Sequence, residues 1–273
     1  MSKEPFIKEQ ELVFNLELWT QRYPKLVAGF TTKNGGNSNS VFHSLNMGLH
    51  VGDTVKAVVE NREKLASLIE IPLTKWVCAE QTHNDNIYVV TSEDHGKGTV
   101  DYTSSIKDTD GFITINKGTL LTMCYADCVP LYFFDTKLNI LGLAHAGWKG
   151  SVAEIGPKMI REIIRLGSDI NDIEVVIGPS ICEKCYTVDN RVIDKVEKIL
   201  DDEREKPYNL KERGQYSLDL KMLNSLLLKK AGVLSSNIFT SGYCSSCDDQ
   251  QFYSYRRDEG KTGRMMSFIG WKE

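Results

Sequence analysis

The sequence contains no long apolar run: no stretch approaches the roughly eighteen apolar residues that suggest a membrane-spanning helix. The N-terminal segment MSKEPFIKEQ has no apolar core of the kind found in secretory signals. The chain also lacks an excess of basic charge, since 33 lysines and arginines are balanced by 37 aspartates and glutamates, for a net charge of −4. These absences argue against a membrane partner, secretion and a nucleic-acid-binding surface, so we expect a cytoplasmic protein.

The seven cysteines do not have the density of a disulfide scaffold, and an odd number cannot all pair within one chain. In a reducing compartment the thiols are available for metal binding or catalysis. There are two Cys-x-x-Cys pairs, Cys182 with Cys185 and Cys244 with Cys247. Each pair has the local spacing of half of the ligand set of a structural zinc site. Because the gap between the pairs is far longer than usual, the sequence favours free thiols at these four positions.

Three predicted strands surround the most reactive side chains. Runs of apolar and β-branched residues span 119–126, 130–134 and 138–144. Cys128 lies between the first two runs, and His145 follows the third. A thiol and an imidazole at strand ends can hold zinc or copper, or they can act as a nucleophile and its base.

A third reactive side chain, His83, follows another strand-like run at 76–81. Two imidazoles and one thiolate, with a fourth position open to water, describe a catalytic zinc site that makes hydroxide available near neutral pH. The remaining histidines, for which a structural or solvated role is the simpler interpretation, are His43, His50 and His95.

Arg62 lies on the apolar stripe of a helix predicted over about 54–70, with Asp53 or Thr54 as its N-cap. A guanidinium that faces the core needs partners, because an unpaired buried charge is costly. Arg62 therefore either pairs with an internal carboxylate or binds an anion such as phosphate.

Several loops carry weaker signals. The motif Asp108-x-Asp110-Gly111 begins like an EF-hand loop but lacks the remaining ligands, and so predicts a turn before a strand. The amphipathic pattern at 191–203 predicts a helix, and the polar segment KPYNLKERGQY at 206–216 predicts a loop.

Taken together and in order, several motifs resemble the YfiH/YlmD-like family, most closely its bacterial YlmD-type members. The resemblance covers essentially the whole chain. It implies a single domain over residues 1–273, with an α+β fold in which a mixed β-sheet core is flanked by helices, related to the cysteine-hydrolase-type fold of CNF-like toxin domains. The motifs are SLNMGLHVGD and ENR within 44–62, EQTH at 80–83, CYADCVPLYFFD at 124–135, LAHAGWKG at 143–150, IGPSI at 177–181, and FYSYRRD and TGRMMSFI within 252–269.

The resemblance implies a purine nucleoside phosphorylase that acts on adenosine, inosine and S-methyl-5′-thioadenosine and also deaminates adenosine. It further implies one zinc ion, or possible copper, held by His83, Cys128 and His145 together with water. One departure is Asn84, which follows His83 where the family usually has glycine. The expected partners are purine nucleosides and phosphate, and the chain is expected to be a monomer or a homodimer.

Phosphorolysis requires an anion clamp, a contact to the departing base and a scaffold that aligns the reactants. Arg62 is the first choice for phosphate, and Asp127 beside the Cys128 ligand can orient a ligand or contact substrate. The other predicted substrate contacts are Asn46, Gln81, Lys149, Arg256 and Arg257.

Two rival functions remain open. Family members were long described as polyphenol oxidases or laccases, and a His₂Cys copper site is chemically possible. Five histidines are too few for the further imidazoles of a multicopper oxidase, so phenol oxidation ranks as a side activity of copper-loaded protein. In the second alternative, Cys128 is the nucleophile and His145 the base of a metal-free hydrolase.

Overall fold

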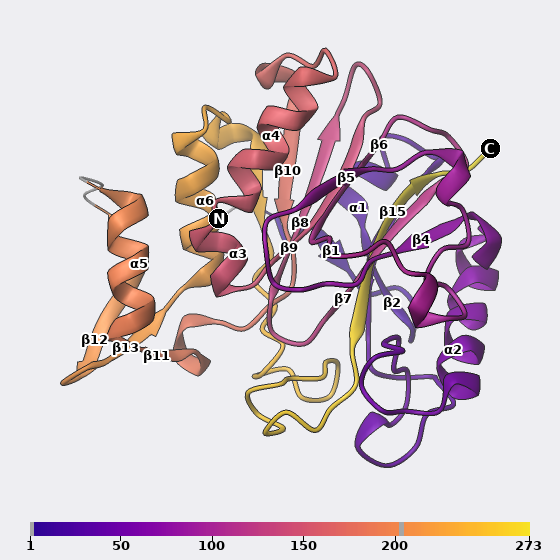
Figure 1. Cartoon of the computed structure of the whole chain (residues 1–273), viewed down its shortest axis with the longest axis horizontal. Helices are drawn as coiled ribbons and strands as arrows, with labels where there is room; N and C mark the ends of the chain where they lie inside the picture. Colours follow the sequence, from indigo (N-terminus) through magenta and orange to yellow (C-terminus); the bar gives the residue numbers. More distant parts are fainter. Residues whose placement is uncertain (1–2, 202–204) are drawn as a thin grey trace.

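Within residues 3–201 and 205–273, which the computed structural model describes, two six-stranded mixed β-sheets pack face to face and helices cover their outer faces (Figure 1). Aromatic and aliphatic side chains from both sheets fill the space between them, among them Phe30 and Met123 of one sheet and Tyr132 and Leu143 of the other. The predicted α+β fold with mixed sheets is confirmed.

The first sheet has the strand order β1-β2-β3-β15-β7-β4 and is antiparallel except at the β4–β7 pair. The C-terminal strand β15 lies near its centre, between β3 and β7. The strands are β1 (Phe6–Ile7), β2 (Val13–Leu16), β3 (Leu26–Thr31), β4 (Trp76–Cys78), β7 (Leu120–Tyr125) and β15 (Met265–Trp271).

The second sheet has the order β14-β10-β8-β9-β6-β5, with parallel pairs at β10–β14 and β5–β6. Its central strand β8 is buried on both faces: Leu131 and Phe133 pack toward the helices, whereas Tyr132 and Phe134 face the first sheet. This alternation follows the two-residue period of a strand. The strands are β5 (Ile87–Val89), β6 (Gly111–Thr114), β8 (Val129–Asp135), β9 (Leu141–Ala146), β10 (Ile173–Ile177) and β14 (Ile238–Thr240).

Helices form the two outer layers. Helix α2 covers the first sheet through Leu65 and Ile69, and Thr54 caps it by accepting a hydrogen bond from the amide of Ala57, which confirms the predicted helix and one of its two candidate caps. Helices α4 and α6 cover the second sheet. The α-helices are α1 (Glu17–Thr20), α2 (Val55–Ile69), α3 (Trp148–Val152), α4 (Ile155–Arg165), α5 (Asn190–Leu200) and α6 (Leu220–Lys230).

A small third sheet, with the order β11-β13-β12, lies beside α5 at the left of Figure 1. Its strands are β11 (Thr187–Asp189), β12 (Tyr208–Glu212) and β13 (Gln215–Leu218). The predicted loop at 206–216 is therefore wrong, because most of it forms a hairpin whose mainly exposed β12 has little apolar alternation. The predicted helix at 191–203 is confirmed as α5, and its residues 202–203 lie outside the described residues.

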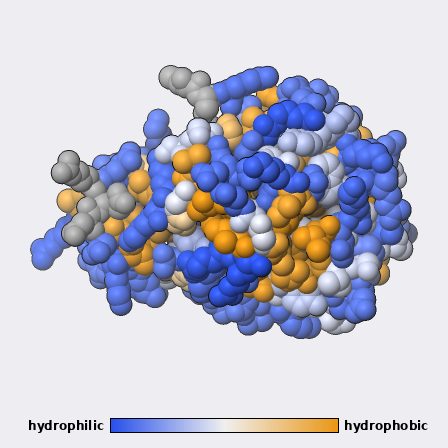
Figure 2. All heavy atoms as spheres, turned by 90° about the horizontal axis from the view of Figure 1, so that it is seen from above, coloured by the Kyte–Doolittle hydropathy of each residue, from blue (hydrophilic) through white to orange (hydrophobic). Residues whose placement is uncertain are grey.

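The surface seen in Figure 2 carries many hydrophilic side chains, with hydrophobic patches between them. Most large apolar side chains lie instead in the three cores between the layers. In the described part of the chain, no helix has the length and apolar character needed to cross a membrane.

Candidate metal centre and active site

Three side chains from separate segments meet where the two central sheets are connected. His83 lies in the loop between β4 and β5, Cys128 lies in the connection from β7 of the first sheet to β8 of the second, and His145 belongs to β9. Their ligand atoms all lie within 4.8 Å of one another. His145 is buried, Cys128 is half-buried and His83 is exposed, so the group is reached from solvent on the His83 side. This cluster can hold a metal ion.

Asp110, a completely buried carboxylate, orients both histidines. Its Oδ1 lies 2.7 Å from Nδ1 of His145, which leaves Nε2 of that ring for a ligand. Its Oδ2 accepts hydrogen bonds from the amides of Thr82 (3.1 Å) and Asn84 (2.8 Å), the two neighbours of His83. His83 itself has a left-handed backbone with φ of 61°. A carboxylate behind a metal-binding imidazole fixes the orientation of the ring, and here it also fixes the loop that carries the second imidazole.

The charges within the cluster favour an anionic sulfur. Burial alone would raise the pKa of the Cys128 thiol, but the charge of His145 and hydrogen bonds from His145 and His83 lower it to about 6. Burial would likewise lower the pKa of His145, but the Cys128 thiolate and the bond to Asp110 raise it to about 9. The thiolate is both the form that binds metals and the form that attacks electrophiles, so this feature is compatible with either chemistry.

Gly147 leaves room for the cluster. A Cβ atom at this position would lie 2.8 Å from Sγ of Cys128 and 3.5 Å from the ring of His83. Its φ of −67° is ordinary, so the backbone does not require glycine there. The missing side chain thus makes space for two converging ligands, and the donor set of one sulfur and two nitrogens suits zinc or copper.

Arg62, the predicted phosphate ligand, is 3% exposed and uses all of its guanidinium nitrogens within the protein. Nε and Nη2 donate to the carbonyl of Met47, and Nη1 donates to the carbonyls of Gly98 and Thr99. Arg62 therefore ties α2 to two loops through backbone carbonyls. This geometry supports neither phosphate binding nor the internal carboxylate partner considered from the sequence.

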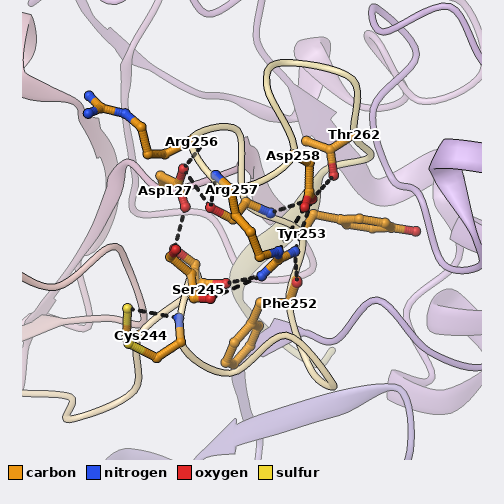
Figure 3. Close-up of polar contacts among 12 residues, drawn as sticks. Asp127, Cys244, Ser245, Phe252, Tyr253, Arg256, Arg257, Asp258 and Thr262 are labelled. Carbon is orange, nitrogen blue, oxygen red and sulfur yellow. Dashed lines mark hydrogen bonds and ion pairs between the residues drawn. The ribbon is translucent and has the colours of Figure 1, made fainter. Parts of the chain in front are cut away.

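Asp127 lies beside Cys128 but faces the C-terminal loop (Figure 3). Its Oδ1 accepts a hydrogen bond from the Ser245 hydroxyl (2.6 Å), and its Oδ2 accepts bonds from the Ser254 hydroxyl (3.0 Å) and the amide of Arg256 (2.7 Å). These contacts occupy both oxygens and make Asp127 an anchor for this loop.

Arg257 is held in the same loop. Its guanidinium donates to the carbonyls of Ser245, Ser246 and Phe252 and pairs with Asp258 through Nε at 2.7 Å (Figure 3). Every nitrogen of the group has a partner, so the contacts of Arg257 are those of a loop-stabilising residue.

Asn46 and Gln81 also make contacts that fix backbone. The Asn46 side chain accepts hydrogen bonds from the amides of Gly48 (3.0 Å) and Arg264 (2.9 Å). The Gln81 amide forms a pair of hydrogen bonds with the backbone of Cys124 (2.7 and 2.9 Å). Both residues therefore shape the surroundings of the cluster.

Lys149 and Arg256 lie near pockets next to the cluster. Lys149 is exposed and lines a pocket of about 740 Å³ with His83 and Trp148, a volume within the range of small-molecule sites. Arg256 stacks over the ring of Tyr186 at 4.9 Å in a second pocket that shares Trp148. The lysines of the first pocket are Lys149, Lys195, Lys198 and Lys230.

Arg264 is a candidate that the sequence reasoning missed. Burial lowers the pKa of its guanidinium, whereas Cys124, Cys128 and Asp127 act on that pKa in the opposite direction. Among the described contacts, its side-chain hydrogen bonds run through Nη1 alone, to the carbonyls of Thr262 and Gly263. Its guanidinium lies 5.8 Å from the centroid of the Tyr255 ring, and Nε and Nη2 make no hydrogen bond to the described residues, unlike those nitrogens of Arg62 and Arg257. It lies within the TGRMMSFI motif.

His50 also lies near this side of the cluster. Desolvation and the charges of Arg264 and Arg62, followed by smaller effects of His145 and His83, lower the pKa of His50 to about 4. A neutral imidazole at physiological pH can donate one hydrogen bond and accept another. The sequence allows His50 to approach a site but favours a structural role for it.

Comparison with known proteins agrees with the resemblance. A family model described as "Multi-copper polyphenol oxidoreductase laccase" matches residues 27–272. The chain belongs to this family. Purine nucleoside phosphorylase YlmD of Bacillus subtilis is 49% identical over 254 residues, which cover 93% of this chain and 91% of that protein. Purine nucleoside phosphorylase YlmD of Geobacillus stearothermophilus is 45% identical over 274 residues, 98% of each chain.

The fold comparison leads to the same family. The crystal structure of YlmD from Geobacillus stearothermophilus matches with a TM-score of 0.96 at 44% identity, and the match covers 99% of this chain and 100% of that one. The YfiH of Bacillus licheniformis, called a hypothetical protein, matches with a TM-score of 0.95 at 45% identity over 99% and 100% of the two chains. The predicted family membership is confirmed.

The multicopper chemistry in the family description does not fit the residues of this chain. Of the five histidines, His83 and His145 belong to the cluster with Cys128. In residues 3–201 and 205–273, no other group of potential metal ligands contains a histidine. One His₂Cys centre is not the set of several copper sites that the description implies.

Proposed function

We propose that this protein is a zinc-dependent purine nucleoside phosphorylase that uses adenosine, inosine and S-methyl-5′-thioadenosine. The observation that carries the proposal is the pair of relatives at 49% and 45% identity that bear the name purine nucleoside phosphorylase, matched over nearly their whole length. The His83–Cys128–His145 cluster adds a reactive centre beside pockets of small-molecule size. Zinc is favoured over copper because phosphorolysis transfers no electrons and needs no redox change.

In phosphorolysis, phosphate attacks the anomeric carbon while the purine departs. The protein must hold an anion, stabilise the charge on the leaving base and align the two reactants. We assign phosphate binding first to Arg264, because its Nε and Nη2 make no hydrogen bond within residues 3–201 and 205–273 and because Cys128 is among the groups that act on the pKa of its guanidinium, which burial lowers. Lys149 and Arg256 are the further cations, and the ring of Trp148, which lines both pockets, offers an apolar surface on which a purine can stack.

His83, Cys128 and His145 are the residues that would hold zinc. When bound at an open His₂Cys site, zinc supplies a positive charge and activates water, which is the chemistry that deamination of adenosine requires. Asp110 holds the His145 ring and the His83 loop in place, and His50 can offer a hydrogen bond to the purine from the same side. The proposal therefore includes adenosine deamination at this site.

The test is an assay of purified protein with inosine and phosphate, in which hypoxanthine and ribose 1-phosphate are separated and quantified. We expect base release that depends on phosphate. Arg264→Gln should lower kcat/KM by about 100-fold, mostly through the KM for phosphate; this is about 2.7 kcal/mol, within the range for loss of a hydrogen bond to a charged group. Arg264→Lys should recover part of this loss.

The matched control is Arg165→Gln, since Arg165 is exposed on α4 and, in the part of the chain that the structure describes, forms its ion pair with Glu162 alone. It should retain wild-type kinetics. Base release that is independent of phosphate, or an Arg264→Gln enzyme with an unchanged KM for phosphate, would contradict the corresponding part of the proposal.

The metal-free hydrolase is the rival function, because a Cys128 thiolate beside His145 also fits a nucleophile and its base. Cys128→Ala and His83→Ala distinguish the two. A nucleophile mechanism requires Cys128 but not His83, whereas a metal centre requires both. An enzyme that keeps full activity after His83→Ala would favour the hydrolase.

A further inference from the structure

The two Cys-x-x-Cys pairs are brought together by the second sheet. Strands β10 and β14 are parallel neighbours, with Ile177 opposite Thr240 at their ends. Because the two strands are parallel, their carboxyl ends lie at the same end of the sheet. The segments that follow continue side by side and are joined by a bridge between Ser180 and Cys244. The long separation of the pairs in sequence is therefore irrelevant to their distance in space.

The four sulfur atoms have the spacing of a tetrahedral metal site. All four lie within 4.8 Å of one another, with 3.8 Å between Sγ of Cys182 and Cys247 and 3.4 Å between Sγ of Cys185 and Cys247. Zinc–sulfur bonds of about 2.3 Å in a tetrahedron place neighbouring sulfurs about 3.8 Å apart. A disulfide needs about 2.05 Å between its sulfurs, and all four cysteines are free thiols.

Backbone amides support the sulfur of Cys244. The amides of Cys182 (3.2 Å) and Cys247 (3.3 Å) both donate to this buried sulfur. Cys185 follows Cys182 in a tight turn, in which the amide of Cys185 donates to the carbonyl of Cys182 at 3.1 Å. Such amide donors stabilise negative charge on sulfur and orient it, as the contacts around metal ligands do elsewhere.

A buried cation lies next to the same segment. Lys221 of α6 donates to the carbonyls of Ser241 and Tyr243, in the segment directly before Cys244. Four thiolates around one Zn²⁺ carry a net negative charge, and Lys221 offsets part of it.

We propose that Cys182, Cys185, Cys244 and Cys247 bind a second zinc ion with a structural role. No histidine or open position takes part, as in closed Cys₄ sites that stabilise folds rather than catalyse reactions. The thiols bind as thiolates, so binding releases their protons to solvent. The proposal is independent of the activity assigned to the His83–Cys128–His145 cluster.

The second zinc would fix the loop that supports the Cys128 segment. Ser245, next to Cys244, donates to Asp127, and the amide of Ile181, next to Cys182, donates to the carbonyl of Asp127 at 3.0 Å. Figure 3 shows the segment with Cys244 and Ser245 beside Asp127, with the hydrogen bond from Ser245 to Asp127 drawn as a dashed line. The ion would thus hold in place the two segments that carry Ser245 and Ile181, the hydrogen-bond donors to Asp127.

Metal analysis of protein purified without chelators tests the proposal. Wild-type protein should contain two zinc ions per chain, and Cys128→Ala should retain one. X-ray absorption at the zinc edge of the Cys128→Ala protein should then show sulfur ligands only, at about 2.3 Å. This measurement leaves the four cysteines intact and so does not depend on the folding of a Cys₄ variant.

The double variant Cys182→Ser/Cys247→Ser should lose one zinc and keep the other. Cys124→Ser is the control, because Cys124 lies outside both clusters, and it should keep two. Zinc-free Cys128→Ala protein, a nitrogen-containing zinc shell in it, or a disulfide between any two of the four cysteines in wild-type protein would overturn the proposal. Wild-type protein with one zinc that survives Cys128→Ala would instead support the Cys₄ site and remove the metal from the proposed active site.

Discussion

Asp110→Asn should weaken zinc binding at the candidate active site without unfolding the protein. The carboxylate has no exposed surface, and its two oxygens face Nδ1 of His145 and the amides on either side of His83. The asparagine side chain has almost the same shape but carries one donor in place of an acceptor. In either orientation of the amide, the NH₂ group of asparagine faces an N–H group that donates a hydrogen bond to Asp110 in the native protein, so two donors oppose each other.

The size of the effect follows from these contacts. Removal of a partner behind a metal-binding histidine typically lowers metal affinity by about 10–100-fold. That range corresponds to about 1.4–2.7 kcal/mol, which is also the order of one hydrogen bond to a charged group. We expect the upper half of the range because one side chain orients two ligands here, and we expect kcat/KM to fall with metal occupancy.

Competition against a chromophoric chelator measures the zinc affinity of wild-type and variant proteins directly. Asp108→Asn is the matched control: it makes the same charge change in the same loop, at an exposed carboxylate bonded to Thr82 and Asn86. This control should bind zinc within about threefold of wild type. Zinc affinity of Asp110→Asn that matches the control would refute the assignment of Asp110 as the group that orients the ligands.

Two further substitutions test the packing around Cys128. Gly147→Ala places a Cβ 2.8 Å from the Cys128 sulfur and should lower zinc affinity by at least about tenfold while circular dichroism stays unchanged, whereas Gly156→Ala, with contacts of 3.3 Å or more, should bind zinc normally. Asp127→Ala removes three hydrogen bonds to the C-terminal loop. It should lower the free energy of unfolding, measured in urea titrations, by about 2–4 kcal/mol, because the three donors lose their carboxylate acceptor. A loss below about 1 kcal/mol would argue against the anchor role.

Much of the fold could be predicted because its central elements carry strong local signals. The buried strands β7, β8 and β9 appear as apolar runs, and α2 has both a regular apolar stripe and a capping threonine. The hairpin of β12 and β13 was missed because β12 is mostly exposed. For such strands the pairing partner, rather than burial, determines the structure.

The metal cluster could be identified from residue type, but its supporting residues could not. His83, Cys128 and His145 are the chemically distinctive side chains at strand ends, and the structure brings them together. Asp110 was interpreted as part of a turn, which is correct for its backbone and says nothing of its side chain. Arg62 attracted attention because it is a charge on an apolar stripe, yet backbone carbonyls satisfy it completely. Sequence pattern shows that a buried charge needs partners, but not whether they are ligands or backbone.

The four clustered cysteines illustrate why sequence spacing can mislead. A short spacing between two Cys-x-x-Cys pairs is needed for a zinc site only when the chain between the pairs must itself bring them together. Here the parallel pairing of β10 with β14 brings the pairs together: Ile177 lies opposite Thr240, and each Cys-x-x-Cys pair begins a few residues beyond the carboxyl end of its strand. Any two motifs that follow adjacent parallel strands meet in this way, whatever the length of chain between them. The relevant question for such pairs is therefore which strands precede them and whether these strands are neighbours.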